Sequence, residues 1–183
     1  MELLLNNPHG GLAPSAWVMR WSRLIAARGS VLDVACGSGR HFRWLATQGF
    51  AVTGLDRDAE ALEALRAQGH CIVADIEAAP WPLSEERFDG VVVTNYLWRS
   101  LWPALRASLS ENGVLIYETF ALGNEVFGKP SNPDFLLRPG ELLEVCKGLH
   151  IVAYEDGLLD APPRRVQRIA ALNRPAAAPF PSL

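Results

Sequence analysis

The chain has 183 residues, a formal net charge of -3 and a hydrophobic fraction of 49%. This length predicts one domain with enough apolar surface for a buried core, and the negative net charge argues against a nucleic acid partner. No apolar run reaches the roughly 18 to 20 residues that cross a bilayer, and MELLLNN at the start has no basic residue before its leucines, so we expect a cytoplasmic protein without a membrane partner.

Short apolar runs predict strands, at residues 31–35, 51–56, 70–75, 88–95 and 113–120. The continuous apolar character of VVV and VLIY is typical of strands that are covered on both faces, as in a parallel sheet between helical layers. Two further runs, at 149–157 and 164–173, are separated by a turn that contains Pro-Pro. They predict an antiparallel pair at one edge of the sheet.

Segments with helical spacing alternate with these strands, at residues 15–28, 39–48, 58–68, 98–109 and 138–147. Ser15 and Asp58 are predicted N-caps, Gly69 a left-handed C-terminal cap, and Pro139 a residue of the first turn of its helix. The alternation predicts an α/β fold with a mainly parallel sheet and helices on both faces.

The domain is expected to span residues 1–173, with an N-terminal lid and helix at 1–28 and a disordered, proline-rich tail at 174–183. Cys36, Cys71 and Cys146 are isolated from one another and from histidines at ligand spacing. They predict free, buried thiols in a reducing compartment and no metal site.

A glycine-rich turn in VLDVACGSGRH (31–41) joins the first strand to a helix, which places backbone N–H groups beside a ligand. The chain contains no Gly-Lys-Ser or Gly-Lys-Thr, so a P-loop is poorly supported. Phe42 stands where a dinucleotide fingerprint needs glycine or alanine. Asp33 is costly to bury unless it meets a cation or a hydrogen-bond donor. The ammonium group of S-adenosylmethionine is such a partner, and a structural acid that caps the turn is the alternative.

VLDVACGSGRH resembles the first motif of the class I S-adenosylmethionine-dependent methyltransferases, and the resemblance extends over residues 15–172. The stretches APSAWVMRW and FGKPSNPDFLLRPGELL are loosely similar to small bacterial methyltransferases of the tellurite-resistance branch. The resemblance implies a Rossmann-like fold with a seven-stranded sheet and an antiparallel edge hairpin. It also implies S-adenosylmethionine as the cofactor and S-adenosylhomocysteine as the product.

The resemblance further implies roles for residues at the strand ends. The glycine loop would pass the methionine portion of the cofactor, Asp56 would bind the ribose hydroxyls, and Asp75 the adenine amino group. Arg20 would bind the cofactor carboxylate, with a solvated surface charge as the alternative. The implied cofactor-binding set is Arg20, Asp33, Ala35, Gly37, Ser38, Gly39, Asp56, Arg57, Asp75, Ile76 and Asn95.

TNYLWR (94–99) resembles the substrate-facing loop after the fourth strand. It lacks the two prolines of [DN]-P-P-[YFW], which disfavours methylation of base amines, and the chain has no Pro-Cys for cytosine methylation. Asn95 and Tyr96 are the candidates for lining the transfer channel, and Arg99 is a candidate anchor for a substrate anion. Glu118 is a candidate base or partner of a substrate ammonium, with a structural salt bridge as the alternative.

The segment 121–137 is too long for a simple connection and predicts a functional loop. We expect it, with Phe127 as a substrate contact, to cover the acceptor together with NPHGGLAPS (7–15). Deletion of residues 1–14 should therefore impair turnover more than folding.

Some residues have simpler expected roles. His9 and His41 should be exposed, and Arg164, Arg165 and Arg168 should lie on solvated faces of the edge hairpin. The pairs Trp17 with Trp21 and Trp98 with Trp102 should pack in the core, since each shares a helix face.

The predicted activity is methyl transfer to a small-molecule acceptor by in-line displacement, in a monomer or homodimer. Two alternatives stay open: methylation of RNA or protein, and a non-catalytic protein that binds S-adenosylmethionine.

Overall fold

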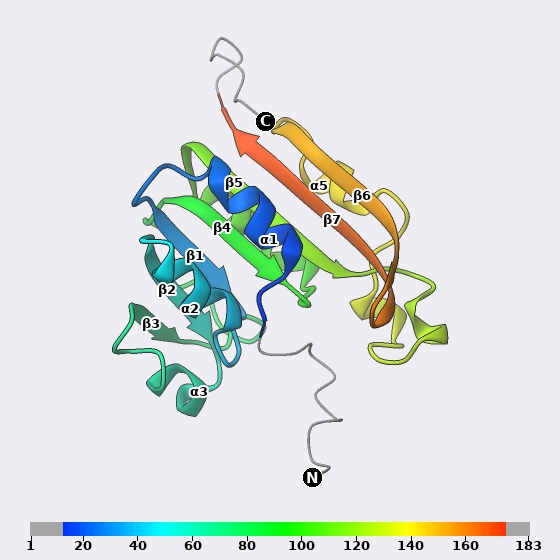
Figure 1. The fold of residues 1–183 in the computed structure, drawn as a ribbon, viewed down its shortest axis with the longest axis horizontal. Coiled ribbons are helices and arrows are strands. Elements are labelled where there is room, and N and C mark those ends of the chain that lie inside the picture. The colour runs from blue at the N-terminus through cyan, green and yellow to red at the C-terminus, as the bar shows by residue number, and fades with distance from the viewer. Residues whose placement is uncertain (1–12, 175–183) are drawn as a thin grey trace.

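The structure, a computed structural model, describes residues 13–174 and contains one seven-stranded sheet (Figure 1). The strand order is β3-β2-β1-β4-β5-β7-β6. The first five strands pair in parallel, and β7 is antiparallel to both β5 and β6. The predicted fold class is confirmed. The strands are β1 (Ser30–Val34), β2 (Ala51–Asp56), β3 (His70–Val73), β4 (Phe88–Thr94), β5 (Leu109–Phe120), β6 (His150–Asp160) and β7 (Pro163–Asn173).

The helices lie on both faces of the sheet, as predicted. Apolar side chains of α1 to α3 pack into one core, and those of α4 and α5 into a second core on the opposite face. The α-helices are α1 (Ala16–Trp21), α2 (Arg40–Thr47), α3 (Ala59–Glu63), α4 (Trp102–Ala107) and α5 (Glu141–Val145). The short 3-10 helices are η1 (Ser22–Leu24), η2 (Arg99–Leu101), η3 (Asn124–Val126) and η4 (Pro133–Phe135).

The helices are shorter than the sequence predicts, but both predicted N-caps are confirmed. The Ser15 hydroxyl accepts a hydrogen bond from the Trp17 N–H at 3.1 Å, and the Asp58 carboxylate accepts one from the Ala61 N–H at 3.0 Å. Both bonds satisfy an N–H that has no partner within its helix.

Two other predictions about helix ends are wrong. Gly69 has no positive φ. It is needed because a Cβ there would lie 2.6 Å from the Val52 carbonyl oxygen. Pro139 precedes α5 instead of standing in its first turn, since Gly140 at φ 73° is the N-cap.

The two cores follow from alternation along the central strands. Val31 belongs to the core under α1 and α2, while Leu32 and Val34 belong to the opposite core. Trp17 and Trp21 are buried in the first core with their ring centroids 5.6 Å apart, as predicted. Because side chains alternate across a strand, Asp33 faces the same side as Val31.

The order of the strands places the binding edge of the sheet. The chain continues from β1 to β2 on one side and from β4 to β5 on the other, so the topology reverses between β1 and β4. Open α/β sheets bind ligands outside the carboxyl ends of the strands at such a point. The glycine loop follows β1 there, and Asn95 follows β4.

The three cysteines are free and buried, as expected. Within residues 13–174, no helix is long and apolar enough to cross a membrane, and no group of three His, Cys, Asp or Glu side chains could hold a metal ion. The predicted lid residues 1–12, including His9, and the tail at 175–183 lie outside the described residues.

Candidate active site

The glycine loop runs from Ala35 to Gly39 and has three residues with positive φ. These are Ala35 at 51°, Gly37 at 53° and Gly39 at 79°. A Cβ at Gly39 would lie 2.5 Å from Leu65 of the turn after α3, whereas a Cβ at Gly37 would meet nothing within 4 Å. Gly39 is therefore fixed by packing as well as by its backbone, and Gly37 leaves open space beside the loop.

Asp33, one residue before the end of β1, is only 1% exposed. The Phe42 N–H donates a hydrogen bond to its carboxylate, but Oδ2 has no partner among the described residues. Burial raises the pKa of Asp33 to about 7, against the lowering effect of that hydrogen bond and of Arg40. A buried carboxylate oxygen without a partner is costly, so this position is suited to a cationic donor from a ligand.

Asp56 ends β2 and lies against the glycine loop. Its Oδ2 accepts a hydrogen bond from the Gly37 N–H at 2.7 Å, and its Oδ1 accepts one from the Asp58 N–H at 3.0 Å. The neighbouring strands β1 and β2 thus bring the predicted ribose ligand to the loop that is predicted to hold the methionine portion.

Within residues 13–174, the residues predicted to bind adenine have no hydrogen bond to the glycine loop of the kind that Asp56 has. β3 ends at Val73, so Asp75 is not in the strand as the sequence suggested, and its Oδ1 accepts from the N–H groups of Glu77 and Ala78. Ile76 is buried, whereas Arg57 and Ser38 are exposed. The roles of these four residues toward adenine and the cofactor stay predictions.

At the end of β4, Asn95 has a positive φ of 53° and its N–H donates to the Glu118 carbonyl at 2.9 Å. A positive φ outside glycine is uncommon and often marks a functional turn. The backbone carbonyl of Tyr96 accepts a hydrogen bond from the Tyr117 hydroxyl at 2.8 Å. Burial, and then the nearby Glu77 carboxylate, raise the pKa of the Tyr96 hydroxyl, so this group stays protonated at neutral pH.

A cavity of about 430 Å³ opens at this corner. One wall comes from the segment after β4 and the end of β5, and the other from the segment 129–135. The cavity has a mainly apolar body with a few polar groups, which is typical of small-molecule sites. Its lining residues are Glu77, Asn95, Tyr96, Leu97, Thr119, Phe120, Lys129, Pro130, Ser131, Asn132 and Phe135.

Glu118, near the end of β5, is 1% exposed and lies among positive charges. Its carboxylate pairs with Arg168 at 3.4 Å and with Arg164 at 3.7 Å, and accepts a hydrogen bond from the Ser15 hydroxyl at 3.1 Å. These contacts favour the structural salt bridge over the role of a base.

Arg165, the third arginine of the edge hairpin, pairs with Asp156. The expectation that the three arginines lie on solvated faces is wrong, because their side chains are only 17% to 29% exposed and each is held in an ion pair.

His41 was expected to be exposed, and this is also wrong. It is 2% exposed, its Nε2 accepts the Ser15 N–H at 3.0 Å, and its Nδ1 lies 3.2 Å from the Thr94 hydroxyl. Burial, followed by the charge of Arg40, lowers the pKa of His41 to about 3. A neutral ring that accepts at Nε2 carries its proton on Nδ1, so His41 donates to Thr94.

The sequence reasoning did not single out Arg40, the first residue of α2. Its guanidinium is half-buried, and burial lowers its pKa, while the charges of Glu118 and Asp33 act in the opposite direction. The GSGR order that places an arginine directly after the glycine loop was the available signal. Arg40 adds positive charge between the glycine loop and the end of β5.

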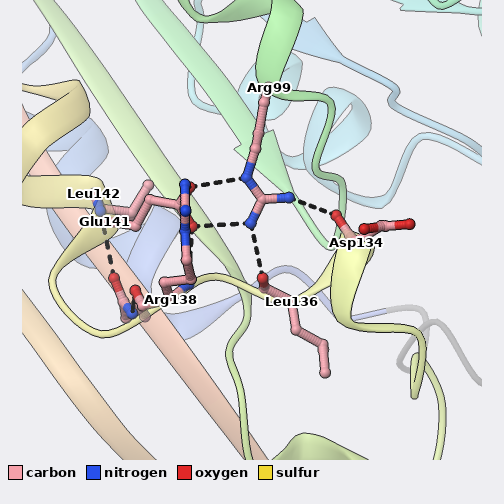
Figure 2. Close-up of polar contacts among 7 residues, drawn as sticks. Arg99, Asp134, Leu136, Arg138, Glu141 and Leu142 are labelled. Atoms are coloured by element: carbon pink, nitrogen blue, oxygen red, sulfur yellow. Dashed lines mark hydrogen bonds and ion pairs between the residues drawn. The ribbon is translucent and has the colours of Figure 1, made fainter.

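The remaining predicted residues lie farther from this edge or are engaged elsewhere. The Arg20 guanidinium stacks over the Trp21 ring at 4.8 Å. Phe127 is 46% exposed and is not among the cavity-lining residues. Arg99 binds the Glu141 carboxylate and two backbone carbonyls (Figure 2). Their predicted contacts with cofactor or acceptor stay predictions.

The residues at the end of β1 and β2 fit S-adenosylmethionine. Asp33 offers an unsatisfied carboxylate oxygen for its ammonium group, Gly37 leaves space for a ligand beside the loop, and Asp56 offers a carboxylate for ribose hydroxyls. The donor set has no phosphate-binding lysine after the glycine loop, which agrees with a cofactor that carries no phosphate.

Comparisons with known proteins agree with this geometry. A family model described as a methyltransferase domain matches residues 31–113. TehB from Haemophilus influenzae has a TM-score of 0.67 at 21% identity, and the match covers 85% of this chain and 60% of that one, so this chain spans less than two thirds of that protein.

Two further solved structures are similar in fold. An S-adenosylmethionine-dependent methyltransferase from Mesorhizobium loti has a TM-score of 0.65 at 17% identity, with 88% of this chain and 100% of that one covered. Coclaurine N-methyltransferase, bound to N-methylheliamine and S-adenosylhomocysteine, has a TM-score of 0.62 at 14% identity, with 85% and 70% covered. No curated protein sequence matches this chain.

The methyltransferase-domain model that matches residues 31–113 and the shared fold agree with the predicted class, an S-adenosylmethionine-dependent methyltransferase of class I. The finer resemblance to the tellurite-resistance branch stays a prediction, because the similarity to TehB lies in the fold.

Proposed function

We propose that the protein transfers a methyl group from S-adenosylmethionine to a small-molecule acceptor that binds in the cavity beside Asn95 and Tyr96. The cavity carries this proposal: at about 430 Å³ it has the size of a small-molecule site, and it adjoins the strand end next to the glycine loop. Residues 129–132 and 135 form its second wall, which supports the predicted covering role of the segment 121–137.

Each predicted residue has a distinct physical role in this proposal. S-adenosylmethionine supplies a methyl group on a positively charged sulfur, so the protein has to align the acceptor and exclude water. The Asp33 carboxylate binds the cofactor ammonium, and Asp56 turns from the Gly37 N–H to the ribose. Asn95 and Tyr96 line the path of the acceptor. The protonated Tyr96 hydroxyl donates a hydrogen bond to the acceptor and does not act as a base.

The size of the cavity, about 430 Å³, favours a small acceptor over RNA or protein. A macromolecular acceptor needs an extended, usually basic, surface, and the net charge is -3. A non-catalytic protein that binds S-adenosylmethionine would use the same cofactor residues, and only turnover distinguishes it. Cytoplasmic location and a monomer or homodimer remain part of the proposal.

The test has two steps. Calorimetry with S-adenosylmethionine and S-adenosylhomocysteine first measures cofactor binding. A screen with tritium-labelled methyl donor then measures transfer to thiols, metalloid oxyanions, small carboxylic acids, amines and total RNA. The proposal expects transfer to at least one small molecule and none to RNA above the background of an Asp33→Asn variant.

Two results would overturn the proposal. Transfer to RNA alone would identify a nucleic acid methyltransferase. Tight cofactor binding with no transfer in any arm, including a protein extract as acceptor, would identify a non-catalytic binding protein. Asp58→Asn is the matched control for Asp33→Asn, because Asp58 is an N-cap at the same edge and asparagine preserves the cap.

A further inference from the structure

Arg99 connects the two walls of the acceptor cavity (Figure 2). It begins η2, just after the cavity-lining residues Asn95, Tyr96 and Leu97. Its Nη1 donates to the Asp134 carbonyl at 2.6 Å, and its Nη2 donates to the Leu136 carbonyl at 2.9 Å. These two carbonyls flank Phe135, which lines the opposite wall. One side chain thus links segments that are 35 to 37 residues apart.

The carboxylate of Glu141 fixes the direction of this guanidinium. Arg99 Nε donates to Oε1 at 2.8 Å and Nη2 donates to Oε2 at 2.9 Å, a two-pronged pairing that holds the plane of the guanidinium. Arg138 donates to the same carboxylate from its backbone N–H and from its side chain. The Glu141 side chain is 6% exposed, while that of Arg138 is 70% exposed.

This link persists across the working pH range. Burial alone would raise the pKa of Glu141, but the hydrogen bonds from Arg99 and Arg138 outweigh it and lower the pKa to about 2. The hydrogen bonds of Arg99 to Glu141, Asp134 and Leu136 together occupy its Nε, Nη1 and Nη2 atoms. Three nitrogen atoms of the guanidinium are therefore bound by groups of the protein, and the role of an anion anchor stays a prediction.

We propose that Arg99 is a positioning residue that determines acceptor specificity by holding the segment 129–135 at a fixed distance from Asn95 and Tyr96. This inference rests on the proposed function, since it assigns the acceptor to this cavity. An acceptor that fills the fixed cavity gains contacts on both walls, and a larger one is rejected because two hydrogen bonds from Arg99 hold the wall on either side of Phe135. A lysine cannot replace this arrangement, because it lacks the planar fork.

The experiment compares Arg99→Met and Arg99→Lys with Arg138→Met in the full-length protein. Arg138→Met is the matched control, because it removes the other arginine of the Glu141 cluster without touching the carbonyls of Asp134 and Leu136. Hydrogen exchange of peptides over 126–137 measures whether the wall is held. Calorimetry measures cofactor affinity, and kcat and KM are measured for the acceptor found in the screen and for a larger homologue.

In Arg99→Met, exchange over 126–137 should become faster and the acceptor KM should rise about tenfold. Both kcat for the preferred acceptor and cofactor affinity should stay within about threefold. The preference for the smaller acceptor should fall about tenfold. Arg99→Lys should recover part of the loss, and Arg138→Met should match the wild type.

Three outcomes would overturn the inference: unchanged exchange over 126–137 in Arg99→Met, faster exchange with unchanged KM and specificity, or equal effects in Arg138→Met. If Arg99→Met does not fold, Arg99→Lys carries the same comparison. Failure of the proposed function is separate, because it would leave no acceptor for the kinetics while hydrogen exchange still reports whether Arg99 holds the wall.

Discussion

Asp33 at the end of β1 and Glu118 at the end of β5 are equally buried carboxylates with opposite surroundings. Each is 1% exposed. One oxygen of Asp33 has no partner within residues 13–174, whereas Glu118 is paired with two arginines and a serine. Burial of a charge is costly in both places, but ion pairs compensate it at Glu118, whereas burial outweighs the Phe42 hydrogen bond and the Arg40 charge at Asp33. The difference indicates that the end of β1 is suited to binding a ligand, while the ion pairs at the end of β5 stabilise the fold.

Replacement of Glu118 should give the largest effect, and it should be on stability. In Glu118→Gln the neutral amide removes the ion-pair partner of Arg164, and Arg168 keeps its ion pair with Glu155. Loss of one member of a buried ion pair costs about 3 kcal/mol in the free energy of unfolding. Urea denaturation measures this loss, and calorimetry should show cofactor affinity near that of the wild type. A folded, equally stable variant with abolished kcat would instead make Glu118 a base.

Replacement of Asp33 should act on cofactor binding and not on stability. Asp33→Asn keeps the shape but removes the charge, so affinity for S-adenosylhomocysteine should fall by about tenfold to a hundredfold, the value of one or two hydrogen bonds to a charged group. Stability at pH 8 should rise, because the buried charge is gone. Calorimetry and thermal unfolding measure the two effects. Normal cofactor affinity in Asp33→Asn, with Asp58→Asn as the control, would contradict the comparison.

The raised pKa of Asp33 predicts how binding depends on pH. The pKa of Asp33 in the free protein is about 7. Below that pH the carboxyl group is protonated, so binding of a cationic ligand has to include the loss of this proton. Cofactor affinity should therefore rise about tenfold from pH 5.5 to pH 7 and flatten above. For folding the sign is opposite. The free protein loses stability as pH rises from about 4 to 7, because the unfolded chain ionises first.

The flanking charges do not produce the same profile. Arg40 stays cationic throughout this range, and its charge lowers the pKa of Asp33 while that of Asp56 raises it. Calorimetry at five pH values tests the prediction, with Asp33→Asn as the control that should show a flat profile. A slope that persists in Asp33→Asn would assign the titration to another group.

The sequence predicts the cofactor side of the cleft better than the acceptor side, for a physical reason. The bounds of β2 were predicted to the residue. The acid of β1 and the glycines after it were also found, because a short local pattern with positive φ angles marks this loop. The roles of His41 and Arg99 depend on partners 26 to 53 residues away, so no local pattern indicates them.

The smallest effect on stability should come from replacement of Ser15, whose hydroxyl donates a hydrogen bond to the Glu118 carboxylate. The same hydroxyl caps α1 at the Trp17 N–H. Ser15→Ala should cost about 1 kcal/mol in the free energy of unfolding, and Ser15→Thr should restore most of it. The Ser15 N–H still donates to His41 in both variants, so cofactor affinity should not change. If Ser15→Ala weakened cofactor binding with no loss of stability, the network around Glu118 would serve the ligand as directly as Asp33 does.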